Sequence, residues 1–327
     1  MEDQGVSHQI RTVAVVGAGL IGASWASLFL AHDLDIAVTD PAPHAEAFLK
    51  RFVTDAWPAL VELAGAPSEI PFHRLSFSPD LESTVRDADL IQESGPETIA
   101  FKRDIYRRLD ALAGPDAIIA SSSSGIRMGD IQGACEAHPG RTLIAHPFNP
   151  PHLLPLVELV GGLRTSGDVI QRARTFYEGP GKRVVVLNRE VIGHVANRLQ
   201  AALFREVVHL VNEGVVSVAD ADAAVRFGPG LRWSVMGQCM LYHLGAGDAG
   251  LRTFLDTFAP SIEAWWADLG RPALDPPTRA KLIAGVAEEA AGRSLSEWAR
   301  YRDAMLISRL KADAEHGKDF AGLGVGI

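Results

Sequence analysis

A glycine-rich turn between an apolar run and a helix-compatible stretch constrains the fold of this chain more than any other feature. The apolar residues 12–16 lead into the sequence GAGLIG at 17–22, and Asp40 ends the next apolar run. In a GxGxxG turn the first glycine permits the tight turn, the second lets the backbone approach a phosphate, and the third lets strand and helix pack closely. The turn alone is a weak signal. Together with the flanking strand, the helix and the acid, it predicts a dinucleotide-binding βαβ unit.

The same stretch predicts NAD as the cofactor. The residues expected to hold its pyrophosphate at the helix N-terminus are Gly17, Gly19, Leu20, Ile21 and Gly22. The Asp40 carboxylate can accept hydrogen bonds from the adenosine ribose, and it would repel the 2′-phosphate of NADP. Because residues 41–48 contain no arginine to hold that phosphate, NAD is favoured over NADP. A turn with only a structural role is the less favoured alternative.

Short β-branched runs, bounded by Gly, Pro, Asp or Ser, continue through the first part of the chain. They are residues 12–17, 35–40, 88–94, 117–122, 141–147, 156–162 and 182–188. Helix-compatible segments, such as 97–111, separate most of them. Continuous apolar strands that alternate with helices indicate a mainly parallel sheet covered on both faces. We therefore expect an α/β Rossmann domain with a doubly wound sheet over residues 1–190.

The remainder of the chain is predicted to be helical. After Val191 the strand signals fade, and apolar residues recur at helical spacing from Val195 to Leu210, ahead of Gly214. Ser217 and Asp220 form a capping-box-like helix start. Further helices are expected at about 250–269, 277–291 and 294–315, and the glycine-rich end, 320–327, is expected to be irregular. Residues 191–327 are thus predicted to form an all-helical C-terminal domain.

Composition excludes several classes of function. The formal net charge of −9 argues against nucleic acid and anionic membrane surfaces as partners. No apolar stretch approaches the roughly 20 residues that span a bilayer, and residues 1–12 are polar, unlike a signal peptide. With only Cys135 and Cys239 and no clustered ligands, neither a metal site nor a disulfide is expected. We expect a reduced, cytoplasmic protein.

A histidine and a glutamate are the candidate catalytic pair. His146 ends one predicted strand, where the crevice of such a sheet lies, and Glu158 stands inside the next apolar run. An isolated buried charge is costly, so an acid inside an apolar strand usually has a partner. Removing a hydride from an alcohol requires a base for the hydroxyl proton, and a neutral histidine held by a carboxylate suits that task. On these residues alone, a separately bonded core glutamate and a loop histidine are equally compatible.

A set of motifs in fixed order resembles the 3-hydroxyacyl-CoA dehydrogenase family over nearly the whole chain. The motifs are GAGLIG (17–22), Asp40, QESGPE (92–97), ASSSSG (120–125), AHPFNPP (145–151), LVELV (156–160) and HVANRL (194–199). The resemblance implies His146 as the general base and Glu158 as its partner. It implies Ser124, with Ser123 as the alternative, and Asn197 as donors to the substrate oxygen.

The resemblance also implies that Glu97 and Lys102 line the nicotinamide side of the cleft. Taken alone, these two residues are more simply an exposed helix start and a solvated lysine. The family includes enzymes for acyl-CoA thioesters and enzymes for small free 3-hydroxy acids such as L-carnitine and L-gulonate. Residues 42–79 form a short stretch whose only Lys and Arg residues are Lys50, Arg51 and Arg74, which leaves little to neutralise the phosphates of CoA.

The segments 227–261 and 288–306 resemble the carnitine branch of the family. Aromatic faces bind trimethylammonium groups through cation–π attraction. The candidates for that contact are Trp233, Tyr242, Phe254, Phe258, Trp265 and Trp266, and core or interface packing is the alternative for each. Arg232 is a candidate for the substrate carboxylate, with an interhelical salt bridge equally plausible.

We expect a homodimer, because the helical domain has many apolar side chains that would otherwise form exposed patches. Two other interpretations of the chain stay open at this point. One is a non-enzymatic relative, against which the complete set His146, Glu158, Ser124 and Asn197 argues. The other is a 3-ketoreductase of secondary metabolism with a larger substrate. We therefore expect NAD-dependent oxidation of a small 3-hydroxy acid to the 3-keto acid. L-carnitine is the first candidate substrate, and L-gulonate and 3-hydroxyacyl-CoA esters are the alternatives.

Overall fold

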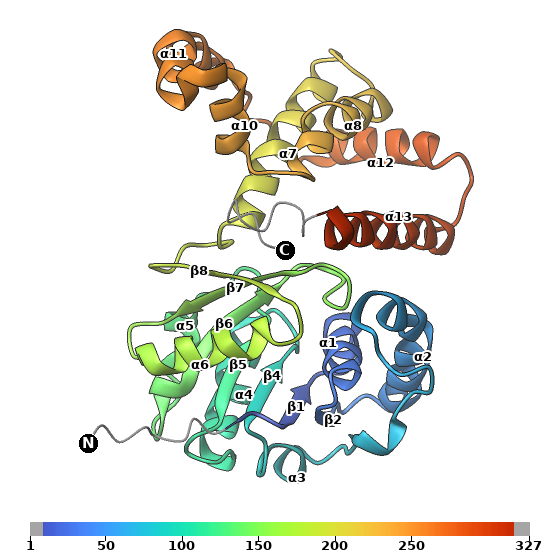
Figure 1. Cartoon of the computed structure of the whole chain (residues 1–327), viewed down its shortest axis with the longest axis vertical. Helices are drawn as coiled ribbons and strands as arrows, with labels where there is room; N and C mark the ends of the chain where they lie inside the picture. The colour runs from blue at the N-terminus through green and yellow to red at the C-terminus, as the bar shows by residue number, and fades with distance from the viewer. Residues whose placement is uncertain (1–8, 317–327) are drawn as a thin grey trace. The chain divides into compact units, whose positions relative to one another are not determined.

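The computed structural model describes residues 9–316, and within them eight strands form one sheet (Figure 1). The strands are β1 (Thr12–Val16), β2 (Asp35–Thr39), β3 (Leu75–Phe77), β4 (Leu90–Glu93), β5 (Ile118–Ser121), β6 (Thr142–Pro147), β7 (Leu156–Gly161) and β8 (Arg183–Val186). Their order is β3-β2-β1-β4-β5-β6-β7-β8, and every neighbouring pair is parallel except β6 and β7. The predicted mainly parallel, doubly wound sheet is confirmed. The apolar pattern did not predict β3.

Alternate residues of the strands supply two separate cores, one on each face of the sheet. Val13 and Val15 of β1 belong to one cluster, and Ala14 and Val16 belong to the other. The first face is covered by α1 (Leu20–Ala31), α2 (Ala45–Ala64) and α6 (Gly167–Glu178). The second is covered by α3 (Leu81–Val85), α4 (Ile99–Leu112) and α5 (Met128–Gln132). Three-residue 3-10 helices are η1 (Phe72–Arg74), η2 (Pro139–Arg141) and η3 (Gly247–Ala249).

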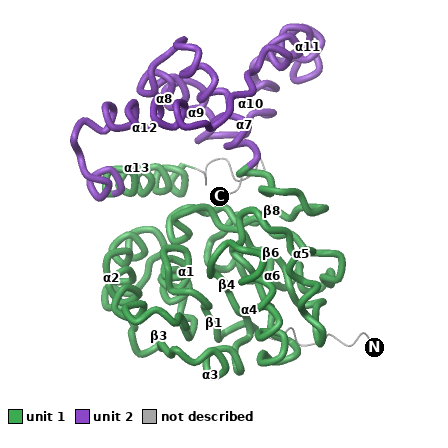
Figure 2. Tube along the Cα trace, turned by 180° about the vertical axis from the view of Figure 1, so that it is seen from behind, with its two compact units in different colours: residues 1–197, 300–327 green, residues 198–299 purple. Residues whose placement is uncertain are grey.

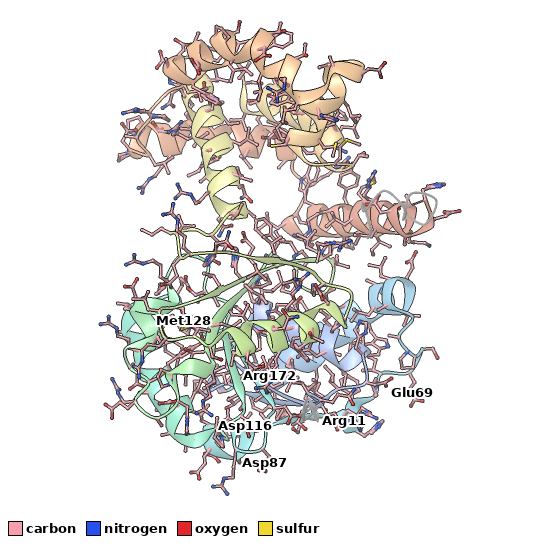
Figure 3. All side chains as sticks on the ribbon, turned by 60° about the vertical axis from the view of Figure 1, so that its left-hand side comes forward. Arg11, Glu69, Asp87, Asp116, Met128 and Arg172 are labelled. Carbon is pink, nitrogen blue, oxygen red and sulfur yellow. The ribbon has the colours of Figure 1, made fainter. Side chains whose placement is uncertain are left out.

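The chain order of the sheet reverses between β1 and β4. From β1 the chain runs outward to β2 and β3, and it then returns to the other side of β1 with β4. Open α/β sheets bind ligands at such a switch point, outside the carboxyl ends of the strands. The opposite, amino-terminal edge is marked in Figure 3 by Arg11, Asp87 and Asp116, which precede β1, β4 and β5. There, Arg172 Nη2 donates to the Asp116 carbonyl at 3.0 Å.

The remaining helices follow the apolar spacing of the sequence. They are α7 (Ala196–Asn212), α8 (Val218–Phe227), α9 (Pro229–Trp233), α10 (Gln238–Gly245), α11 (Gly250–Asp268), α12 (Pro276–Ala290) and α13 (Leu295–His316). Ser217 caps α8, because its Oγ accepts a hydrogen bond from the Asp220 amide at 3.0 Å. The expected irregular end at 320–327 lies outside the described residues. None of the helices described in 9–316 has the length and apolar character needed to cross a membrane.

The chain divides into two compact units (Figure 2). Unit 1 runs through Asn197 and resumes at Arg300, whereas unit 2 is Arg198–Ala299. Helices α7 and α13 therefore each contribute to both units. The division into residues 1–190 and 191–327 stays a prediction.

Candidate active site

The glycine turn after β1 is shaped by close backbone contacts. A Cβ at Gly17, whose φ is +100°, would lie 2.8 Å from the carbonyl oxygen of Ser94, and a Cβ at Gly22 would lie 1.8 Å from that of Gly17. Both positions therefore require glycine for packing. A Cβ at Gly19 would meet no atom within 4 Å. The backbone at Gly19 faces open space at the start of α1, as the approach of a pyrophosphate requires.

The carboxylate of Asp40 is fixed beside this turn. Its Oδ2 accepts a hydrogen bond from the Ala18 amide at 2.8 Å, and its Oδ1 accepts one from the Ala42 amide at 2.9 Å. Each carboxylate oxygen has a further lone pair, so both can still accept hydrogen bonds from ribose hydroxyls. The open glycine backbone and the fixed acid fit the pyrophosphate and adenosine ribose of NAD. The exposed Leu20 and half-buried Ile21 begin α1 next to this opening.

His146 and Glu158 face each other across the antiparallel pair β6–β7. They are direct partners in the strand register, and His146 Nδ1 lies 2.9 Å from Glu158 Oε2. Both side chains are buried, with relative exposures of 4% and 1%. Because a carboxylate only accepts, Nδ1 carries the hydrogen and Nε2 is left with a lone pair. This tautomer leaves Nε2 able to act as a base.

Glu158 holds a second set of donors on its other oxygen. Its Oε1 accepts hydrogen bonds from the Val195 amide at 2.8 Å and the Ala196 amide at 3.0 Å, where α7 begins. Burial acts to raise the pKa of Glu158, but the hydrogen bonds from His146 and the two amides outweigh it and lower that pKa. The carboxylate therefore stays ionised beside the imidazole and stabilises its protonated form.

Ser124 and Asn197 lie around the free nitrogen of His146. The distances from His146 Nε2 are 3.2 Å to Ser124 Oγ and 3.5 Å to Asn197 Nδ2. Asn197 Nδ2 also approaches the Ser124 carbonyl, at 3.4 Å. Ser123, the alternative from the sequence, points elsewhere: it is buried, and its Oγ donates to Glu97. The geometry thus favours Ser124 over Ser123, and all four predicted catalytic residues lie together in unit 1.

Glu97 anchors the loop that carries Ser124. Its Oε1 accepts hydrogen bonds from Ser123 Oγ at 2.6 Å, the Ser124 amide at 3.0 Å and the Gly125 amide at 2.8 Å. Burial acts to raise the pKa of Glu97, but these hydrogen bonds and the nearby Lys102 lower it overall. Glu97 is exposed just ahead of α4, as its simpler interpretation expects, and its carboxylate also holds the serine loop. A cofactor contact by this residue stays a prediction.

Lys102 is buried rather than solvated. Its exposure is 1%, and its Nζ lies 2.8 Å from both carboxylate oxygens of Glu93, which is itself fully buried at the end of β4. Ser121 Oγ also donates to Glu93, at 2.8 Å. The sequence analysis missed Glu93 as a site residue, although it lies within the motif at 92–97. Lys102 Nζ is engaged within the protein, and its role toward NAD stays a prediction.

His194 is a second site residue that the sequence did not reveal. It is 1% exposed, and its ring centroid lies 4.9 Å from that of His146. The sequence offered one indication of this role, because His194 begins the motif HVANRL at 194–199.

The predicted substrate residues all belong to unit 2. Trp233 and Arg232 lie at the end of α9 and are exposed, and Trp233 Nε1 donates to Gln238 Oε1. Tyr242 of α10 stacks on Phe254 of α11 with ring centroids 4.3 Å apart. The further aromatic candidates on α11 are Phe258, which packs on Phe254, and the exposed Trp265 and Trp266. Their roles toward a substrate stay predictions.

This arrangement supplies the groups that proton transfer from an alcohol requires. The base nitrogen of His146 carries a lone pair, its carboxylate partner is fixed, and two small polar side chains lie beside it. Between residues 9 and 316, no group of three or more His, Cys, Asp or Glu side chains is arranged to hold a metal ion.

Comparisons with known proteins cover nearly the whole chain. A family model described as "3-hydroxyacyl-CoA dehydrogenase, NAD binding domain" matches residues 12–191, and one for the C-terminal domain of that family matches residues 193–271. An L-carnitine dehydrogenase of Pseudomonas sp is 44% identical over 97% of this chain and 99% of its own length. One from Streptomyces griseus is 45% identical over 93% of this chain and 90% of its own length.

Solved structures of similar proteins share the fold of this chain. The NAD+-dependent 5-formyl-3-hydroxy-2-methylpyridine 4-carboxylic acid 5-dehydrogenase superimposes with a TM-score of 0.78 at 29% identity, over 92% of this chain and 97% of that one. FadB2 of M. tuberculosis has a TM-score of 0.65 at 30% identity, over 84% and 94%. The similarity therefore extends through both the sheet and the helices that follow it.

Proposed function

This chain belongs to the 3-hydroxyacyl-CoA dehydrogenase family of NAD-dependent enzymes, and from that membership we propose that it oxidises L-carnitine to 3-dehydrocarnitine. The observation that carries the proposal is the buried pair His146–Glu158, whose free nitrogen lies beside Ser124 and Asn197. The substrate assignment is supported by relatives that are L-carnitine dehydrogenases, at 44% and 45% identity over nearly the whole chain.

The proposed chemistry assigns a separate task to each side chain. His146 Nε2 takes the proton from the 3-hydroxyl group, and Glu158 stabilises the resulting imidazolium through Nδ1. Ser124 Oγ and Asn197 Nδ2 hold the substrate oxygen by donating hydrogen bonds as it becomes a ketone. The glycine turn and Asp40 would hold NAD, which would supply the hydride acceptor for the carbon that bears this oxygen.

A small free acid suits the segment after β2 better than a CoA ester does. That segment is one helix, α2, followed by η1 and β3. Two of its three Lys and Arg residues have carboxylate partners: Lys50 lies 2.7 Å from Glu46 and Arg74 lies 3.3 Å from Asp35. Three cations, two of them beside a carboxylate, supply little positive charge to neutralise the phosphates of CoA.

The trimethylammonium group is proposed to bind an aromatic surface in unit 2. Tyr242 stacks on Phe254 with ring centroids 4.3 Å apart, and Phe258 packs against Phe254 at 5.0 Å with its ring tilted by 39°. Aromatic faces attract quaternary ammonium groups through their quadrupoles. Trp233 is a further candidate for this contact, and Arg232 is proposed for the carboxylate of the substrate.

The test is an assay of NAD reduction over four substrates: L-carnitine, L-gulonate, 3-hydroxybutyrate and 3-hydroxybutyryl-CoA. We expect the highest kcat/KM with L-carnitine, and a lower rate when NADP replaces NAD because of Asp40. Preferred turnover of L-gulonate or of the CoA ester would replace the substrate assignment and leave the dehydrogenase chemistry in place. Failure with all four, together with reduction of a larger 3-keto acid by NADH, would favour a ketoreductase of secondary metabolism.

The assembly and location of the enzyme are part of the proposal. A homodimer is supported by the many exposed apolar side chains on the helices of unit 2. A cytoplasmic location is supported by the cysteines, because the buried Cys135 and the exposed Cys239 are both free thiols.

A further inference from the structure

His194 packs directly against the proposed base, and the proposed chemistry does not use it. The rings of His194 and His146 are inclined by 39°, with their centroids 4.9 Å apart. At 1% exposure, His194 is shielded from solvent. A titratable ring held this close to the base affects both its orientation and its proton affinity.

One nitrogen of His194 is bonded to the serine loop. Its Nε2 lies 3.0 Å from the carbonyl oxygen of Ser123, which can only accept, so Nε2 carries the hydrogen. Its Nδ1 then holds a lone pair, and this atom is buried with no hydrogen-bond partner among the described residues. The next residue along the loop is Ser124, whose Oγ lies 3.2 Å from His146 Nε2. His194 therefore contacts both members of that hydrogen bond: the ring of His146 and the loop of Ser124.

The backbone at His194 is held in an unfavourable conformation. Its φ is +48°, next to Gly193 at +76°, and a left-handed backbone is costly for a residue with a Cβ. The same turn directs the amides of Val195 and Ala196 to Glu158 Oε1, at 2.8 and 3.0 Å. Such strain persists only where surrounding contacts fix it, and it is concentrated at functional sites.

The surroundings of His194 favour its neutral form. A proton on Nδ1 would create a buried donor without an acceptor, beside a base that must itself become charged. Burial is the largest influence on His194 and lowers its pKa; the Ser123 hydrogen bond raises it and His146 lowers it. Glu158 on β7 and Glu97 ahead of α4 raise it less, so the net change is a lowered pKa.

We propose that His194 is a positioning residue for the dehydrogenase reaction. As a neutral imidazole it holds the Ser123 carbonyl and covers one face of the His146 ring, which keeps Ser124 Oγ at the basic nitrogen. The proposal rests on the proposed function, in which His146 is the base. It adds a requirement that His194 stay unprotonated while His146 gains and loses its proton.

The first test compares two substitutions that separate the hydrogen bond from the ring. His194→Phe keeps an aromatic ring without a donor, whereas His194→Gln keeps an N–H near the position of Nε2. We expect His194→Phe to lower kcat by roughly 10- to 100-fold, as misplaced catalytic groups do, and His194→Gln to recover most of that loss. The Kd for NAD should be unchanged in both. Wild-type kcat in a folded His194→Phe variant would overturn the proposal.

The pH profile supplies a readout that a purely structural role would not change. Each group that must stay unprotonated adds up to one unit to the limiting slope of log kcat/KM against pH at the acid end. If His194 is such a group, that slope should be about one unit smaller in His194→Gln than in the wild-type enzyme. Equal slopes would overturn the requirement for a neutral His194. Folding is checked by circular dichroism and thermal unfolding, with His73→Gln, an exposed histidine of η1, as the matched control.

A second measurement does not depend on turnover. ¹⁵N NMR of the histidine side chains should show His194 neutral at pH 7 with its hydrogen on Nε2. An imidazolium, or a hydrogen on Nδ1, would overturn the assignment. If the wild-type enzyme oxidises none of the substrates tested, the proposed function fails, and the NMR result still decides whether His194 donates to Ser123.

Discussion

The imidazole of His146 is the group on which the proposed chemistry depends most directly. Replacing it with glutamine should lower kcat with L-carnitine by roughly 10²–10⁴, the range found for loss of a general base. Affinity for NAD should not change, because the glycine turn and Asp40 follow β1 and β2, which are away from β6 in the sheet order. Steady-state kinetics and fluorescence titration with NAD measure the two effects separately.

The control for this substitution is His138→Gln, which changes an exposed histidine just ahead of β6. It should leave kcat and NAD affinity at their wild-type values. If His146→Gln lost NAD affinity in proportion to kcat, the imidazole would have a structural role instead.

At the residue scale, sequence reasoning succeeded where local pattern carries the information. An acid within an apolar strand and a histidine at a strand end left a pair and two separate roles equally compatible, and the motif resemblance favoured the pair. The structure places His146 Nδ1 2.9 Å from Glu158 Oε2. Sequence reasoning failed for Lys102, because a lysine on a helix is ordinarily solvated and its partner Glu93 lies on the preceding strand. His194 was also missed, since its contact with His146 depends on a turn at positive φ.

At the scale of elements, the loop between β6 and β7 is held to the helix that follows the glycine turn. Lys182, just before β8, donates through Nζ to the carbonyls of Pro151 and Leu154 in that loop. Its ammonium also lies 5.1 Å from the ring centroid of Trp25 in α1. The loop joins the strands that carry His146 and Glu158, so Lys182 links the candidate base and acid to the cofactor helix.

Lys182 should make stability depend on pH in the neutral and alkaline range. Burial lowers its pKa to about 7, so between that value and the usual lysine pKa the unfolded chain binds more protons than the folded one. The free energy of unfolding should therefore rise from pH 7 to pH 9, by at most about 1.4 kcal/mol per pH unit from this group. Lys182→Met should lack this contribution in urea unfolding.

Lys50→Met, which removes an exposed lysine of α2, is the control and should keep the wild-type pH dependence. Identical pH dependence in Lys182→Met and the wild-type protein would contradict a neutral Lys182 in the folded state.

Element prediction was accurate for long periodic segments and weaker for short ones. The helices expected at 250–269 and 277–291 correspond to α11 and α12 within one residue at each end. β3 was missed because three residues, none fully buried, give no apolar run to detect. It is fixed instead by its parallel pairing with β2, which is distant in sequence.

At the scale of the whole molecule, the apolar surface of unit 2 predicts self-association. Light scattering should give twice the mass of one chain. The most exposed large apolar residues of this unit include Leu199, Val215, Phe227, Leu231, Trp265, Trp266 and Ile283. Replacing Trp265 and Trp266 of α11 together with glutamate should shift the enzyme toward monomer, because charges are disfavoured in the centre of an interface.

Leu163→Glu changes a fully exposed residue of unit 1 and should leave the mass unchanged. A wild-type mass of one chain would contradict the dimer, and an unchanged mass in the double variant would remove α11 from the interface.

The architecture as a whole was the most predictable level. The Rossmann sheet followed by helices was expected from strand and helix signals alone. The last helix, α13, joins unit 1 from Arg300 onward, and Lys311 lies 2.6 Å from Glu62 of α2. Local sequence patterns cannot predict an ion pair between residues so distant in sequence.

Glu158 accepts a hydrogen bond from the His146 imidazole with one oxygen and from the amides of Val195 and Ala196, where α7 begins, with the other. The same side chain therefore orients the candidate base and caps a helix. A descendant of this enzyme that lost its activity would still need that acceptor to begin the helix. A glutamate retained at position 158 would then be weak evidence for catalytic activity, whereas a histidine retained at position 146 would be strong evidence. Inferring activity for any new member of this lineage should therefore weigh the two positions unequally.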